Sequence, residues 1–237
     1  MDSFPSPSIR SDRLDLREFG ADDLGLAVEV VAEGVPEALP PGVPADRDEL
    51  AAWFATGMYS TGRADAVHLI MLDRASGRMV GAIGVFHPDW QVRSAEIGYG
   101  VRTDARSQGY ATEALAAVAS WLLTEAGIQR AWLSANTDNT ASIRVAQKAG
   151  FRREGTLRRA GIEDDGLHDL AVFSLLDDDE RPELRPEGTH RRDHAPTRAV
   201  RSRYGSSADS GSETAPEVGA GFGLRGSLSP APPPRPG

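Results

Sequence analysis

A short loop, Arg106-Ser107-Gln108-Gly109-Tyr110-Ala111, has the residue types and spacing to bind a phosphate or pyrophosphate. It lies between an alternating segment, 94–101, and an amphipathic one, 110–126, so it is predicted to join a strand to a helix. The first N–H groups of a helix are unpaired and lie at the positive end of its dipole. Because Gly109 and Ala111 lack bulk, an anion could approach these amides closely. A strand-to-helix turn that happens to hold glycine is the alternative interpretation.

The strand predicted before this loop carries one charged side chain on an otherwise bare face. Glu96 alternates with Gly98 and Gly100 on that face, and the apolar residues between them point to the other. A face without side chains lets a ligand lie against the backbone. Glu96 is therefore a candidate general base, and a salt bridge or cap is the alternative role.

Two segments further along the chain extend the pattern. They are Asn139-Thr140-Ala141-Ser142-Ile143-Arg144 and Lys148-Ala149-Gly150-Phe151-Arg152-Arg153-Glu154-Gly155. Together with the loop and with Ala95-Glu96-Ile97-Gly98-Tyr99, they resemble the GNAT superfamily of N-acetyltransferases. Within it they are similar to the RimJ/RimL branch, which acetylates protein N-termini and has relatives acting on small amines. The resemblance covers roughly residues 14–177 and implies acetyl-CoA as cosubstrate.

The resemblance implies an α/β fold with a mixed, mostly antiparallel central sheet of about seven strands flanked by four helices. Apolar periodicity places the strands near 14–16, 66–72, 79–86, 94–101, 129–135, 151–162 and 168–176, and the helices near 22–31, 46–58, 110–126 and 139–150. The predicted organisation is an N-terminal extension, a GNAT domain and a disordered tail rich in Pro, Gly, Ser and Arg, at 1–10, 11–178 and 179–237.

By the same resemblance, acetyl-CoA contacts two parts of the chain. In the family the strand splays from its neighbour, and pantetheine pairs with the strand backbone, here at Tyr99, Gly100 and Val101. The diphosphate would lie on the loop and helix start, with Arg102 or Arg106 as the cation. The loop and helix residues expected to bind the cofactor are Arg106, Ser107, Gln108, Gly109, Tyr110, Ala111, Thr112, Asn139 and Ser142.

Two side chains are assigned to catalysis. Glu96 would deprotonate the acceptor amine, directly or through one water, while a backbone N–H near Val101 polarises the carbonyl. Many GNAT enzymes carry a tyrosine acid four residues beyond the Ser142 position, where this chain has Ala146. That difference leaves the Ser142 hydroxyl to protonate the CoA sulfur, unless Ser142 merely occupies the first helical turn.

The acceptor is predicted to be a primary amine of modest basicity. An α-amine with a pKa of about 7.9 is about one-ninth neutral at pH 7, whereas a lysine at about 10.4 is neutral roughly once in 2500. One general base contributes typically ~10²–10⁴-fold, which suits an N-terminal or small-molecule amine better than lysine. Residues expected to face the acceptor are Glu37, Glu96, Asn136 and Asp165. His168 is interpreted as structural or substrate-contacting, and His87 and Trp90 as parts of a connection outside the site.

Composition limits the other classes of function. The chain has 237 residues and a net charge of −9, divided into −12 up to Glu180 and +3 beyond it. Such an acidic body repels a phosphate backbone, so nucleic-acid binding is not expected, whereas a cationic amine would be attracted. The acidity could also serve solubility alone.

There is no cysteine, which excludes a disulfide framework and a cysteine-based metal site, and no metal site is predicted. No apolar run is long enough to span a membrane, and Pro5 and Pro7 interrupt any signal-like start. We therefore expect a cytoplasmic monomer or homodimer.

Two other hypotheses are weighed. A non-catalytic acyl-CoA-binding module would keep the loop and lose the chemistry, which the presence of Glu96 and Ser142 disfavours. A dinucleotide-binding oxidoreductase would need Gly-x-Gly-x-x-Gly after its first strand. This loop comes in the middle of the chain with a single glycine, so that hypothesis is set aside.

Overall fold

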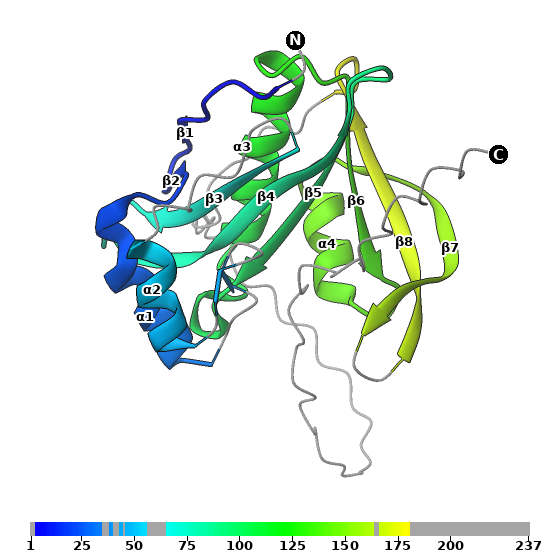
Figure 1. The fold of residues 1–237 in the computed structure, drawn as a ribbon. Helices are drawn as coiled ribbons and strands as arrows, with labels where there is room; N and C mark the ends of the chain where they lie inside the picture. Colours follow the sequence, from blue (N-terminus) through cyan, green and yellow to red (C-terminus); the bar gives the residue numbers. More distant parts are fainter. Residues whose placement is uncertain are drawn as a thin grey trace, which may run out of the picture.

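A computed structural model describes residues 3–34, 38–39, 43–44, 46–55, 65–163 and 166–180. Its centre is an eight-stranded sheet in the order β1-β2-β3-β4-β5-β6-β8-β7, antiparallel throughout except between β5 and β6 (Figure 1). The strands are β1 (Ile9–Arg10), β2 (Leu14–Arg17), β3 (Ala66–Asp73), β4 (Met79–Asp89), β5 (Ser94–Val101), β6 (Arg130–Asn136), β7 (Arg152–Glu163) and β8 (Gly166–Leu176). The predicted mixed, mostly antiparallel sheet is confirmed, and β1 is the strand that was not expected.

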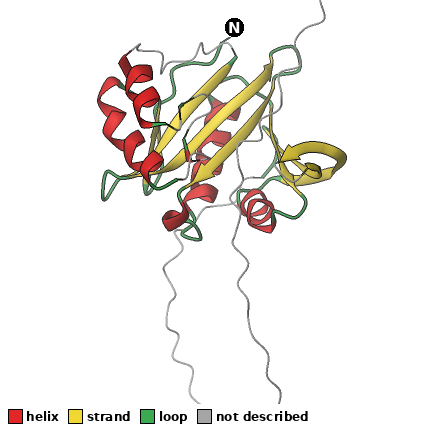
Figure 2. Cartoon of the chain, turned by 60° about the horizontal axis from the view of Figure 1, so that its bottom comes forward, coloured by secondary structure: helices red, strands yellow, loops and turns green. Residues whose placement is uncertain are grey.

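Within the described residues, four α-helices flank the sheet, as predicted. They are α1 (Leu24–Ala32), α2 (Arg47–Ala55), α3 (Tyr110–Thr124) and α4 (Thr140–Lys148), with 3-10 turns at Ala21–Asp23 and Thr103–Ala105. Helices α1 and α2 cover one face of the sheet, and α3 crosses the other (Figures 1 and 2). No described helix combines the length and apolar character needed to cross a bilayer.

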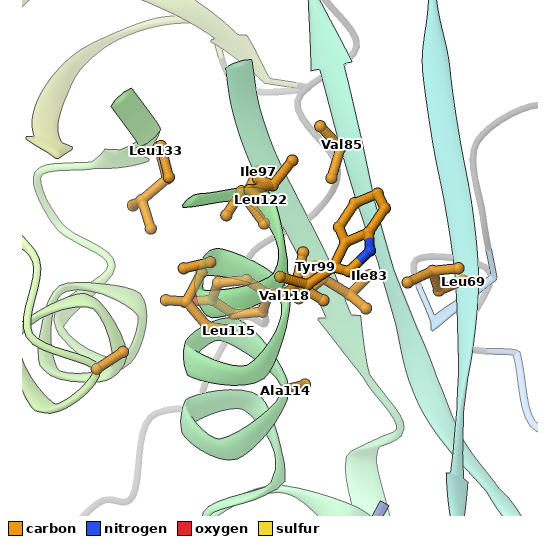
Figure 3. Packing of buried hydrophobic residues seen from close by; sticks show 14 of the residues in the cluster. Leu69, Ile83, Val85, Ile97, Tyr99, Ala114, Leu115, Val118, Leu122 and Leu133 are labelled. Carbon is orange, nitrogen blue, oxygen red and sulfur yellow. The ribbon is translucent and has the colours of Figure 1, made fainter. Parts of the chain in front are cut away.

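The two faces have separate cores because neighbouring strand residues point in opposite directions. On β4, Ile83 faces α3 and packs in one buried cluster with Leu115 and Val118 (Figure 3). The adjacent Ala82 belongs to the second cluster, with Leu50 of α2. This assignment matters for the site, since it identifies the face on which each residue of β5 lies.

Strands β5 and β6 run parallel and are paired only at their beginnings. Ser94 to Glu96 pair with Arg130 to Trp132, and the ladder ends there although both strands continue. The predicted splay is thus present, and it begins at Glu96.

One predicted boundary was wrong. Residues 87–90 were expected to form a connection, but β4 continues to Asp89. The ladder with β5 slips by one residue between Phe86 and Asp89, which is the geometry of a β-bulge. The alternating pattern is lost at a bulge, so periodicity alone could not extend the strand.

Candidate active site

The edge of β5 that β6 leaves unpaired presents main-chain groups from alternate residues. The Arg102 N–H donates to Val80 O at 2.9 Å, which makes this a hydrogen-bonded pair of the β4–β5 ladder. Hydrogen-bonded pairs alternate along an antiparallel ladder, so Gly100 also faces β4, while Tyr99 and Val101 turn their N–H and C=O groups away from it. Of the three backbone contacts predicted for the cofactor, those of Tyr99 and Val101 are thus directed to the open edge.

The loop after β5 leads into α3, and the first main-chain N–H groups of this helix have no partner within it. Gly109 occupies the N-cap position with φ 82°, a left-handed conformation that suits glycine, and no side chain caps the helix. The first intrahelical bond comes from Glu113 N–H to Gly109 O at 3.0 Å. By helix geometry the N–H groups of Tyr110, Ala111 and Thr112 therefore have no partner within the helix. This end of α3 can accept an anion, as predicted from the sequence.

The loop and the start of α3 are held by the N-terminal part of the chain. Arg13 donates through Nη1 to Gln108 O at 2.9 Å and through Nε to Glu113 Oε2 at 2.7 Å. Its guanidinium lies 4.7 Å from the centroid of the Tyr110 ring, and the Tyr110 hydroxyl donates to Asp73 Oδ2 at 3.0 Å. We call this group the loop clamp. The Tyr110 side chain thus serves the protein itself, which leaves its main-chain N–H as the group for a cofactor.

The two arginines predicted to supply positive charge to the cofactor differ in their surroundings. Arg102 is 1 % exposed, donates to Met79 O at 3.2 Å and forms a salt bridge with Glu33 at the end of α1. Arg106 donates through Nε to Val101 O at 3.2 Å. Because Arg102 is buried against α1, the arrangement favours Arg106 as the cation near the loop.

Glu96 lies where β5 and β6 part. Its side chain is 14 % exposed, and each of its oxygens has a neighbour. Oε2 is 2.9 Å from His87 Nδ1, and Oε1 accepts from Ser134 Oγ at 3.3 Å. The carboxylate is therefore held by β4 on one side and by β6 on the other.

Ser142 lies on the other side of the sheet. Asn139 caps α4 through Oδ1, which accepts from Ser142 N–H at 3.0 Å. The Asn139 side chain therefore already has a structural partner. Ser142 is 3 % exposed, and its main-chain oxygen accepts from the Tyr99 hydroxyl at 3.5 Å. Burial raises the pKa of Tyr99 to about 12, so this hydroxyl stays protonated. Tyr99 belongs to the α3-side cluster, whereas Glu96 alternates to the opposite face. The two predicted catalytic residues thus flank the splayed strands.

The predicted acceptor residues are only partly described. Glu37 and Asp165 lie outside the described residues. Asn136 ends β6, and its Oδ1 accepts from Asp138 N–H at 3.0 Å, which closes the turn before α4. It shares a face with Ser134, two residues earlier.

Two residues that contact Glu96, Ser134 and His87, were not in the predicted site. Ser134 could have been included, because β6 alternates as predicted and pairs in parallel with β5. His87 could not have been included from the sequence, since in a regular ladder it would oppose Ala95 and point toward α3. The bulge and its φ of 48° bring it to Glu96 instead. His68 on β3 packs its ring 5.3 Å from that of Phe86, and burial lowers the pKa of His68 to about 4.

The splayed parallel pair, the uncapped helix after the loop and the carboxylate at the fork are the parts expected of an N-acetyltransferase. The sequence profile of the GNAT acetyltransferase domain family matches residues 13–152. The chain belongs to this family.

Among its relatives, an uncharacterized N-acetyltransferase of Bacillus subtilis, YoaA, is 32 % identical over 103 residues, 44 % of this chain and 58 % of that protein. The ribosomal-protein-serine acetyltransferase of Escherichia coli is 27 % identical over 100 residues, 42 % and 56 % of the two chains. The chain thus spans little more than half the length of these two relatives. The predicted similarity to RimL is confirmed.

A solved structure of the ribosomal L7/L12 α-N-protein acetyltransferase RimL in complex with coenzyme A has the same fold. The TM-score is 0.59 and the identity 19 %, over 73 % of this chain and 97 % of that one.

Proposed function

We propose that the protein transfers an acetyl group directly from acetyl-CoA to a primary amine, either the α-amine of a protein N-terminus or a small-molecule amine. The observation that carries this proposal is the fork between β5 and β6, where a strand edge that β6 leaves unpaired and a largely buried carboxylate meet. A relative that acetylates a ribosomal-protein serine and a similar fold solved with coenzyme A support both the donor and the acceptor class.

The residues present fit the cofactor. Main-chain groups of Tyr99 and Val101 offer strand-like pairing to the pantetheine amides. The uncapped amides of Tyr110, Ala111 and Thr112 offer donors and a positive dipole to the diphosphate. Gly109 has no Cβ to obstruct its approach, and Arg106 supplies positive charge beside it.

Glu96 acts as the general base. A thioester lying along the β5 edge would reach the fork at which Glu96 stands, and the amine would approach on the face of the sheet that carries Glu96. The amine nitrogen forms the new C–N bond while the C–S bond breaks, and Glu96 takes the proton that the nitrogen gives up. Ser142, on the α4 side, would donate a proton to the departing sulfur and recover one from solvent, to which Glu96 releases its own. Val101 N–H would stabilise the oxyanion.

The test is a turnover assay with acetyl-CoA and a panel of serine-initiated peptides and small amines, together with calorimetric titration of coenzyme A. We expect Glu96→Gln to lower kcat by about 10²–10⁴-fold, the usual range for a general base, with coenzyme A affinity unchanged. Arg93→Gln, in the exposed β4–β5 turn, is the matched control.

Coenzyme A binding without product from any amine would favour the non-catalytic module instead. Equal kcat for Glu96→Gln and the unmodified protein would remove Glu96 from the mechanism.

A further inference from the structure

The acceptor must release more protons than one carboxylate can hold. An ammonium that becomes an amide loses two protons, of which one ends on the CoA sulfur and the other must reach the solvent. Glu96 is only 14 % exposed and is enclosed by β4 and β6, so it has little direct contact with water. The side chain that connects it to the surface is His87, which is 63 % exposed.

The contact between these two side chains determines which ring nitrogen is free. An ionised carboxylate can only accept hydrogen bonds, so the 2.9 Å contact with Glu96 Oε2 places the proton of a neutral ring on His87 Nδ1. Nε2 then keeps its lone pair, on a side chain that is mostly exposed. Imidazole is the side chain best suited to exchanging protons near neutral pH.

The backbone supports a specific role for this side chain. His87 has a φ of 48°, which costs energy for a non-glycine residue and which the surrounding structure must impose. Without the bulge, His87 would point to the α3 face, away from Glu96. The bulge and the strained backbone of His87 are therefore what pairs the imidazole with the carboxylate.

We propose that His87 is the first proton acceptor of the reaction, an inference that rests on the proposed acetyl transfer. His87 Nε2 takes a proton from the incoming ammonium and yields the neutral amine and an imidazolium. The Glu96 carboxylate stabilises that imidazolium through Nδ1–H, and the exposed ring then gives the proton to water. Glu96 receives the second proton during attack on the thioester.

Other titratable groups surround this end of the sheet. They are Asp65 and His68 at the start of β3, Asp89 at the end of β4 and Arg93 in the turn before β5. His68 is separated from His87 by the Phe86 ring, with centroid distances of 5.3 and 6.4 Å. Because its pKa is lowered to about 4, His68 is neutral at pH 7 and adds no charge beside His87.

The test compares His87→Asn with the unmodified protein, using acetyl-CoA and a serine-initiated peptide. Asparagine tolerates a positive φ and keeps an N–H donor for Glu96, but it cannot accept the proton. The variant must rely on amine that is already neutral in solution, about one-ninth of an α-amine at pH 7 and nearly all of it at pH 9. We expect kcat/KM to fall about tenfold at pH 7 and to match the unmodified protein at pH 9. In His87→Gly, added imidazole should restore activity at pH 7.

Arg93→Asn is the matched control, because Arg93 has a similar φ of 52° in the same region and no bond to Glu96 among the described contacts. An equal loss in His87→Asn at pH 7 and pH 9, or no loss at either, would overturn the inference. If Glu96→Gln is impaired in the same assays, the proposed function survives that result. If the unmodified protein forms no product with any amine, the proposed function itself fails, whereas an unimpaired Glu96→Gln removes only Glu96 from the mechanism.

A second measurement needs no acceptor. Nitrogen NMR of the histidine rings in the full chain should show the neutral His87 ring protonated at Nδ1, and this preference should disappear in Glu96→Leu, which leaves no acceptor beside the ring. Protonation at Nε2 in the unmodified protein would contradict the proposed proton path.

Discussion

At the scale of single residues, burial decides which titratable groups respond to pH. His68 lies under the Phe86 ring, and its pKa is lowered from 6.5 to about 4 because burial disfavours the charged ring. At Glu154 the charged form is favoured instead, because hydrogen bonds from Arg130 and Ser174 lower the pKa of this surface carboxylate to about 2. A carboxylate of this kind loses its stabilising effect only between about pH 4.5 and pH 2, so His68 dominates the milder range.

From the lowered pKa of His68 we predict that the protein loses stability on mild acidification. Between pH 6.5 and pH 4 the unfolded state binds a proton that the folded state refuses, so the free energy of unfolding falls as pH falls. The full effect is roughly 3 kcal/mol, since one pKa unit corresponds to about 1.4 kcal/mol. We expect the free energy of unfolding of His68→Leu, measured by chemical denaturation, to fall less between pH 7 and pH 4 than that of the unmodified protein. The difference between the two falls should be about that amount. Parallel pH profiles for the two proteins would contradict this.

At the scale of elements, the loop clamp joins three segments that are distant in sequence. Arg13 follows β1, Gln108 and Tyr110 belong to the loop and α3, and Asp73 ends β3. Glu113, on the first turn of α3, also accepts from Ser11 Oγ and Arg13 N–H, each at 2.7 Å. The clamp therefore holds the amide-rich end of α3 against the edge of the sheet.

Arg13→Ala is expected to weaken acetyl-CoA binding and to leave the chemistry intact. A bond to a charged group contributes about 1.5–3 kcal/mol, and a loss of ~1.4 kcal/mol corresponds to tenfold. We predict that KM for acetyl-CoA rises about tenfold, with kcat at saturation changed less than about twofold. Arg10→Ala is the control, since Arg10 is 68 % exposed and pairs with Asp15 away from the loop. An unchanged KM in steady-state kinetics would exclude the clamp from cofactor binding.

At the scale of the whole molecule, the beginning of the chain closes the core. Phe4 is 2 % exposed and packs against Trp90 at 4.8 Å and Trp121 at 6.2 Å between ring centroids. It joins the end of β4 to α3, and β1 pairs with β2 immediately after it. Residues 1–10 were predicted as an extension, and their described part packs on the domain.

Phe4→Ala should therefore destabilise the whole fold. Truncation of a buried phenylalanine costs about 3–5 kcal/mol through lost burial and the cavity left behind. Thermal or denaturant unfolding should show that loss, whereas Val92→Ala, at a side chain 65 % exposed, should be within about 0.5 kcal/mol of the unmodified protein. A change of similar size in both variants would mean that Phe4 is not part of the core.

The amino-acid sequence by itself determined the local features of this protein. The alternation around Glu96 defines β5, the residues after it define the loop, and Asn139 caps α4 as its residue type predicts. Each of these depends on neighbours a few positions apart, where hydrophobic period and turn chemistry act. Tertiary structure alone decided the pairing of His87 with Glu96 and of Arg13 with Gln108. The first depends on a one-residue slip of the ladder, and the second joins positions 95 residues apart. No local pattern encodes either, because register and long-range packing are set by the folded sheet as a whole.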